Sequence, residues 1–204
     1  MKRLSYLLTL LLPLLWSCST TGPAVFGNAA GRALAQTGAR YTPAENPATG
    51  LYGYVNDLGL WVIQPKFDAA QNFNDCGLAR VRIGNRYGAI DPLGQLVIAA
   101  VFSNGYTVDA AIRSIDKGRL PGIELWAEYD PASERYGYLD HYGRWAIAPQ
   151  FLSAREFDTN GIAVVAVEKN RWGAIDRRGA IVVQPSFNNS YEAEAAVRRL
   201  SGRR

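Results

Sequence analysis

The chain has 204 residues, of which 48% are hydrophobic and 20% are charged, so it can bury a domain-sized core and is not disordered throughout. Its formal net charge is +4. Two basic residues stand at positions 2 and 3 and four stand at positions 198, 199, 203 and 204, which leaves 16 basic against 18 acidic residues elsewhere. That balance excludes the basic surface expected of a nucleic-acid-binding protein.

The first residues predict a targeting segment. Lys2 and Arg3 precede an apolar run from Leu4 to Trp16. A helix of that length reaches about 20 Å at about 1.5 Å per residue, short of the roughly 30 Å hydrocarbon core of a bilayer. Residues 1–17 are therefore predicted to be a cleaved signal peptide rather than a transmembrane helix.

The end of this segment, Leu15-Trp16-Ser17-Cys18, resembles the lipobox of bacterial lipoproteins. The resemblance implies lipidation of Cys18 and membrane attachment through that N-terminal lipid, which several acyl chains make stable. Because Ser19 is not the Asp that retains such proteins in the inner membrane, it also implies an outer-membrane location facing the periplasm. The alternative is an ordinary signal peptide with an incidental cysteine.

Residues 18–49 are small, polar and rich in Gly and Pro, and they predict a flexible tether, with a short strand near residues 39–42 as a further element. A lipidated Cys18 would leave Cys76 with no second cysteine in the chain, so no disulfide framework is expected. Cys76 is predicted to be a buried thiol, with an intermolecular disulfide as the alternative.

One phrase then occurs four times. The copies begin at residues 52, 87, 136 and 172 and read YGYVNDLGLWVIQPKF, YGAIDPLGQLVIAAVF, YGYLDHYGRWAIAPQF and WGAIDRRGAIVVQPSF. The glycines after the first aromatic residue, which we call the anchor glycines, are Gly53, Gly88, Gly137 and Gly173. They are separated by 35, 49 and 36 residues, so the repeat unit is about 35 residues long and the second copy carries an insert.

Each phrase predicts a β-hairpin. Asp91, Asp140 and Asp176 follow the anchor glycine by three residues, Asn56 takes this place in the first copy, and a second glycine comes three residues later. Asx-x-x-Gly is typical of a three-residue hairpin loop, in which the Asx side chain accepts backbone hydrogen bonds and Gly takes a positive φ. The apolar strand after the turn ends in most copies at a proline, and the Phe two residues on is predicted to fill the layer between units.

These units predict an all-β fold, an array of four hairpin-like repeats of about 35 residues with two to three antiparallel strands each. The domain spans residues 51–188, with units near 51–83, 87–129, 136–168 and 172–188. A short helix and basic tail at 189–204 follow, opened by a capping box of Asn189 and Glu192. The alternative is a closed, propeller-like ring of four units.

The repeated unit resembles the bacterial WG repeat, named for a pair seen here as Trp172-Gly173, and the resemblance covers about residues 51–188. It implies an all-β array found in envelope and surface proteins. It also implies a role in binding, with no catalytic residues and no specified ligand.

Little in the sequence indicates catalysis. The single histidine, His141, is predicted to be an exposed turn residue, and no nucleophile, metal-ligand set or phosphate-binding loop accompanies it. No metal or cofactor is expected, and the chain is predicted not to be an enzyme. The less favoured alternative is an enzyme that uses the insert at residues 103–135, whose carboxylates are Asp109, Asp116, Glu124, Glu128 and Asp130.

The aromatic residues leave two alternatives for binding. Those before the anchor glycines, Tyr52, Tyr87, Tyr136 and Trp172, are predicted to fill the core, whereas Trp61 and Trp145 fit a packing slot or an exposed ligand contact equally well. We therefore expect a lipid-anchored interaction or scaffold module with a protein partner in the envelope. The alternative is a module that binds cell-wall glycan through exposed aromatics.

Overall fold

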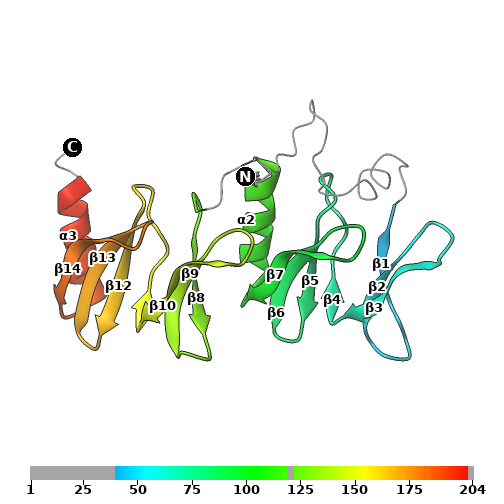
Figure 1. The fold of residues 1–204 in the computed structure, drawn as a ribbon, viewed down its shortest axis with the longest axis horizontal. Helices are drawn as coiled ribbons and strands as arrows, with labels where there is room; N and C mark the ends of the chain where they lie inside the picture. Colours follow the sequence, from blue (N-terminus) through cyan, green and yellow to red (C-terminus); the bar gives the residue numbers. More distant parts are fainter. Residues whose placement is uncertain (1–39, 119–121, 202–204) are drawn as a thin grey trace, which may run out of the picture.

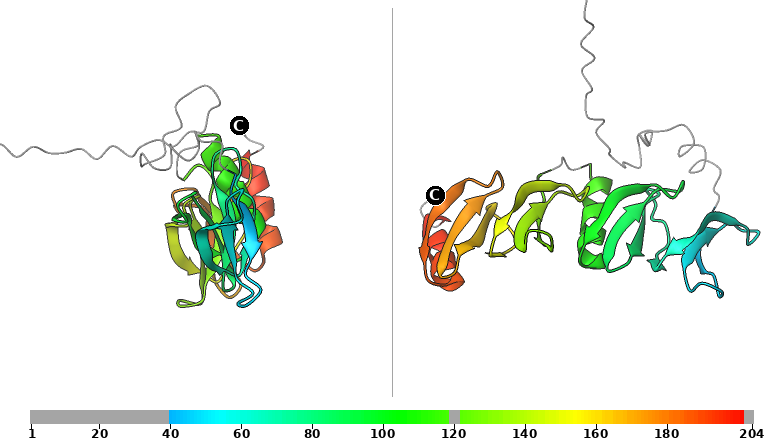
Figure 2. Two further views of the ribbon diagram at one scale, coloured as in Figure 1. Left: turned by 90° about the vertical axis from the view of Figure 1, so that its right-hand side faces the viewer. Right: turned by 60° about the horizontal axis from the view of Figure 1, so that its bottom comes forward.

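The computed structural model describes residues 40–118 and 122–201, which form a row of four small antiparallel sheets (Figure 1). The first sheet lies at one end of the row and the C-terminal helix at the other, and two further views show the same open arrangement (Figure 2). The predicted all-β repeat array is confirmed. The closed ring does not form, because the first and last sheets lie at opposite ends.

The strands follow the predicted hairpins closely. The first sheet has the order β1-β2-β3, formed by Thr42–Glu45, Tyr52–Val55 and Trp61–Phe67. The second has the order β4-β5-β6-β7, formed by Ala69–Ala70, Ala79–Ile83, Arg86–Ile90 and Leu96–Phe102. The third has the order β10-β9-β8, in which β8 is Trp126–Asp130, β9 is Arg135–Leu139 and β10 is Trp145–Phe151. The fourth has the order β11-β12-β13-β14, formed by Ser153–Ala154, Ile162–Glu168, Arg171–Asp176 and Ile181–Phe187.

The sheet boundaries differ from the predicted units. We assigned the strand at 77–83 to the unit that begins at residue 51, but β5 pairs with β6 of the following phrase. In the same way β8 and β12 pair with the phrases that follow them, and β1 pairs with β2. Strand β1 consequently lies within the predicted tether of residues 18–49, and the fourth phrase has its third strand in β12.

The turns have the Asx geometry that their sequence predicts. In the second hairpin the Asp91 side chain accepts hydrogen bonds from the backbone N–H groups of Leu93 and Gln95, both at 2.9 Å. Gly94 closes this turn with a φ of +76°. Asn56, Asp140 and Asp176 accept the equivalent pairs of bonds in the other hairpins.

Glycine is required at the four anchor positions because the backbone of the strand after the turn lies very close to each of them. The strand after each turn has a register shift around its proline, or around Ala100 in the second copy, and pairs with the sheet again at the Phe, so pairing continues past the proline instead of stopping there. The shifted segment passes directly over the anchor glycine. A Cβ added at Gly173 would lie 2.5 Å from the Val183 carbonyl oxygen and 2.9 Å from the Pro185 backbone nitrogen, which leaves no room for any side chain.

Neighbouring sheets are joined through these turns. The turn at Gly94 packs on Ile63 of β3, and Lys66 Nζ donates to the Gly94 carbonyl at 3.3 Å. The turn at Gly179 packs in the same way on Ile147 of β10. Each unit thereby covers apolar side chains that its predecessor cannot bury alone, which is the stabilisation expected of a repeat array.

Helix α2 was not predicted. It spans Gly105–Asp116 within the insert and buries Val108, Ala111, Ile112 and Ile115 against the second sheet. Asn104 caps its first turn by accepting a hydrogen bond from Thr107 N at 2.9 Å. The insert is therefore partly a structural element of the core rather than a solvated loop.

Helix α3, Ser190–Ser201, packs on β12, β13 and β14 of the fourth sheet. It begins at the predicted capping box, in which Glu192 N donates to Asn189 Oδ1 at 3.0 Å and Asn189 Nδ2 donates to Glu192 Oε1 at 3.0 Å. Its sequence SYEAEAAVRR matches GYTVDAAIRS of α2, so sheets one and two with α2 correspond to sheets three and four with α3.

Candidate functional site

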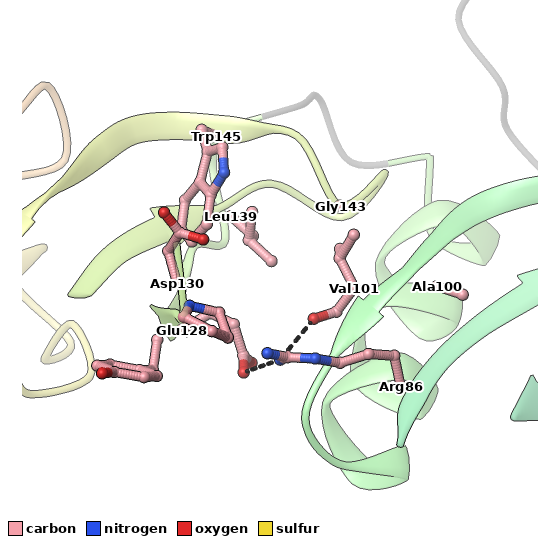
Figure 3. Close-up of a pocket in the computed structure, with 10 residues that line it drawn as sticks. Arg86, Ala100, Val101, Glu128, Asp130, Leu139, Gly143 and Trp145 are labelled. Carbon is pink, nitrogen blue, oxygen red and sulfur yellow. Dashed lines mark hydrogen bonds and ion pairs between the residues drawn. The ribbon is translucent and has the colours of Figure 1, made fainter. Parts of the chain in front are cut away.

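The second and third sheets enclose a cleft of about 200 Å³ (Figure 3). Arg86 and Val101 come from one side of this cleft, and Glu128, Asp130 and Trp145 come from the other. Leu139, Gly143, Ala100, Tyr129 and Pro131 complete the lining. The site is therefore formed by two successive repeats rather than by one.

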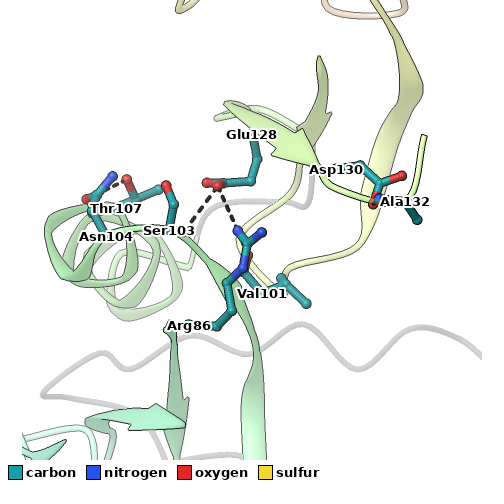
Figure 4. A network of polar contacts seen from close by, with 8 residues as sticks. All are labelled: Arg86, Val101, Ser103, Asn104, Thr107, Glu128, Asp130 and Ala132. Carbon is teal, nitrogen blue, oxygen red and sulfur yellow. Dashed lines mark hydrogen bonds and ion pairs between the residues drawn. The ribbon is translucent and has the colours of Figure 1, made fainter. Parts of the chain in front are cut away.

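An ionic network ties the two sheets together at the base of the cleft (Figure 4). Arg86 Nη1 donates to Val101 O at 3.0 Å and to Glu128 Oε1 at 3.1 Å. The same carboxylate oxygen accepts from Ser103 N at 3.2 Å, and Glu128 is 4% exposed. Because this buried charge has a partner of opposite sign and a backbone donor, its role is to hold the joint.

The mouth of the cleft carries different chemistry. The Trp145 side chain packs over Gly137, and Trp145 as a whole is 41% exposed. The Tyr129 ring contacts that of Tyr136 in a tilted arrangement, with 5.2 Å between ring centroids and 58° between ring planes. Asp130 accepts a 2.7 Å hydrogen bond from the Ser133 hydroxyl, which is the main cause of its lowered pKa, so it stays ionised at neutral pH.

The dimensions and groups of the cleft suit the binding of one small group. Its volume lies below the roughly 300–1,000 Å³ usual for small-molecule pockets, so it fits one inserted side chain or one ring. An indole face, a phenol and an acceptor carboxylate can hold such a group. Arg86 and Glu128 already neutralise each other and are not arranged to transfer a proton to a bound group.

The predicted aromatic sets lie in different environments. The residues before the anchor glycines are half-buried and pack on the cores, as Tyr52, Tyr87, Tyr136 and Trp172 all show. Trp61 is half-buried and Trp145 is exposed. Their counterparts Leu96 and Ile181 are 49% and 52% exposed, so an apolar side chain recurs at the start of each second strand of a hairpin along the row.

His141 is not an exposed turn residue, and that prediction is wrong. It is fully buried, because α2 covers the turn that carries it. Its Nδ1 lies 3.4 Å from Ser114 Oγ on α2, and its ring meets Tyr142 edge-on at 4.3 Å. Burial lowers the pKa of His141, so it is neutral at pH 7.

The carboxylates of the insert do not converge on one site. Asp109 pairs with Arg80, Glu128 pairs with Arg86, and Asp116 accepts from Asn74 Nδ2 at 3.0 Å. Glu124 lines a separate shallow hollow beside Arg113 and Lys117. Within residues 40–118 and 122–201, no group of three or more His, Cys, Asp or Glu side chains stands close enough to hold a metal ion.

The cysteines differ from the prediction in part. Cys76 lies half-buried in a turn capped by Asn74 and is disulfide-bonded, so the predicted buried thiol is wrong. Cys18, the predicted lipidation site, lies outside the described residues together with the predicted signal peptide.

Helix α2 and two turns between the units were not predicted, although the sequence carries a signal for each. The match between YTVDAAIR and YEAEAAVR indicates a second helix inside the insert. The turns at Asn74–Gly77 and Asp158–Gly161 repeat the Asx-x-x-Gly pattern between units, and their side chains accept the same backbone bonds. The pairing of Arg86 with Glu128, 42 residues apart, has no such signal.

Comparison with known families supports the repeat assignment. The family described as WG containing repeat matches residues 52–87 and 136–170, which begin at equivalent positions of the two halves. These two stretches are therefore similar to WG repeats. A search of curated proteins and a search of solved structures found no match. None of the helices in the described part of the chain is long and apolar enough to cross a bilayer.

Proposed function

We propose that this WG-repeat chain is a non-catalytic interaction module of the cell envelope, anchored by lipid on Cys18 and serving as a binding or scaffold protein. The observation that carries the interaction role is the recurring apolar position at the start of each second strand, exposed at Leu96, Trp145 and Ile181 and half-buried at Trp61, together with the cleft beside Trp145. Regularly spaced apolar contacts on a rigid array suit an extended protein partner.

Photocrosslinking in cells tests the interaction role. A photoreactive amino acid at Trp145 or Ile181 is expected to capture one and the same envelope protein. A probe at Tyr106, which is 85% exposed on α2, serves as the control and is expected to capture nothing in common with them. Absence of an adduct at Trp145 and Ile181, or identical adducts from Tyr106, would contradict the proposal.

The second candidate function is recognition of cell-wall glycan. The exposed indole of Trp145 beside Tyr129 and the ionised Asp130 fits the stacking face and the hydroxyls of one sugar ring. Sedimentation of the protein with purified peptidoglycan measures this binding. Trp145→Ala is expected to abolish it, and Trp61→Ala, on a half-buried side chain, is expected to weaken it less; binding that neither substitution changes would remove the glycan role.

The anchor is tested separately. Labelled palmitate is expected to be incorporated into the full chain and not into Cys18→Ala. A thioether-linked lipid uses the Cys18 sulfur, so in the lipidated chain the disulfide of Cys76 would have to join another molecule. Label that persists in Cys18→Ala, or a peptide that joins residues 18 and 76 in the protein isolated from membranes, would contradict lipidation. A periplasm-facing, outer-membrane location is part of the same proposal.

A further inference from the structure

The joint between the second and third sheets shows how one half of the molecule docks on the next. Ala99 N of β7 donates to Tyr142 O in the third hairpin turn at 3.0 Å. A Cβ at Gly143 would lie 2.9 Å from Val101 Cγ2, so this turn packs tightly against the edge strand β7. Helix α2 covers the same turn through Ser114 and His141.

The turn surface recurs, uncovered, at the start of the row. Leu58 and Gly59 of the first hairpin correspond to Tyr142 and Gly143, yet Leu58 is 81% exposed and a Cβ at Gly59 would meet nothing within 4 Å. The residue just before the Asx residue of this turn is also less buried in the first unit than in the other three. Val55 is only half-buried, whereas its counterparts in the other three units, Ile90, Leu139 and Ile175, are at most 1% exposed.

The acceptor surface recurs, also uncovered, at the end of the row (Figure 1). Strand β14 and helix α3 correspond to β7 and α2, with Gln184 in the place of Ala99. Phe187 is half-buried, whereas Phe67, Phe102 and Phe151 are at most 4% exposed. Leu200 of α3 is 44% exposed, whereas its counterpart Ile115 is buried.

We propose that these two ends bind each other in different copies, so that the first hairpin turn of one chain docks on β14 and α3 of a second copy. Charge complementarity supports the pairing. Asp57 corresponds to His141 and Arg199 corresponds to Ser114, the two residues that face each other in the internal joint. An acidic residue of one copy would then meet a basic residue of the next.

The contact is weaker than the internal joint and extends without closing. Glu128 and Trp126 correspond to Ala44 and Thr42, so the buried ion pair and the Phe102–Trp126 ring contact have no equivalent. The first hairpin turn and the β14–α3 surface are different surfaces at opposite ends of the row. A pair of docked copies therefore still has one free surface of each type, and further copies add in a line. This inference goes beyond the proposed function, because it concerns the ends of the row and not the cleft.

Photocrosslinking between isotopically distinct copies tests the contact. The full chain with a photoreactive amino acid at Leu58 is mixed in detergent with ¹⁵N-labelled wild-type chain and irradiated. The expected adduct joins it to the labelled peptide of residues 179–198, and a probe at Tyr106 gives no such adduct. Adducts confined to the same chain, to other labelled peptides, or none at all, would overturn the proposal.

Charge reversal tests the register of the contact. Both residues are exposed, so the variants are expected to keep the fold. Asp57→Arg and Arg199→Asp are each expected to weaken self-association in sedimentation by about tenfold, and the double variant to restore it. Self-association that neither single reversal changes, or self-association of the double variant that is weaker than that of both single variants, would overturn the pairing.

Discussion

At the scale of residues, the fold depends on the anchor glycines. Gly173→Ala places a methyl group against the backbone of Val183 and Pro185, so we expect it to lower the free energy of unfolding by about 2–4 kcal/mol. Gly84→Ala is the matched control, because its Cβ meets nothing and only its φ of +59° resists substitution, at about 1 kcal/mol. Urea titration measures both, and equal losses would show that close approach is not the cause.

The turn aspartates act through their hydrogen bonds rather than their charge. Asp176 accepts from Arg178 N and Ala180 N, both at 2.9 Å, and Asn56 makes the same pair of bonds in the first hairpin. We expect Asp176→Ala to cost about 1 kcal/mol and Asp176→Asn to cost much less. Thermal unfolding compares the two variants, and similar losses in both would point to charge instead.

His141 gives the molecule a defined acid sensitivity. Its folded-state pKa lies below the ordinary value of 6.5, so the unfolded chain binds more protons near that pH. Stability is therefore full above about pH 6.5 and falls as pH drops toward the folded-state pKa, by at most about 1.4 kcal/mol per pH unit. His141→Gln is expected to flatten this slope in unfolding measured from pH 7 to 5, and an unchanged slope would assign it to other groups.

At the scale of elements, the joint between the second and third sheets depends on a buried charge. The Glu128 side chain is 5% exposed and that of Asp109 is 37% exposed, although each pairs with an arginine on another element. We expect Glu128→Ala to cost about 3 kcal/mol because Arg86 loses its partner, and Asp109→Ala to cost under about 1 kcal/mol. Chemical denaturation compares them, and a larger loss for Asp109→Ala would contradict this ranking.

The elements show which parts of the fold the sequence could predict. The hairpins followed from Asx-x-x-Gly and the apolar strand after it, because those signals are local to about ten residues. The helix in the insert was not predicted from its own residues. Its sequence signal is the similarity to α3, which lies about 85 residues later and outside any local window. The strands between phrases were assigned to the wrong sheets, because alternation in β5 or β12 does not say which neighbour it pairs with.

The candidate site was predictable only in part for the same reason. Trp145 was identified from its repeat position, and it does line the cleft. Arg86 and Glu128 meet across two sheets, and His141 is buried by a helix that lies earlier in the chain. Such contacts depend on how units stack, which a repeat pattern alone leaves undetermined.

At the scale of the whole molecule, stability is expected to pass from unit to unit. Ile147 of the third sheet is covered by the turn at Gly179 of the fourth, so each sheet relies on the next for burial. In an array of this kind, a lost contact weakens the two units that share it and leaves distant units nearly unchanged.

Native-state hydrogen exchange of Ile147→Ala measures this most directly. The account predicts that amides in β9 and β13 lose protection together, by about 2–4 kcal/mol, while amides in β2 at the far end keep theirs. A loss confined to the third sheet, or an equal loss in all four sheets, would contradict stabilisation by stacked neighbours.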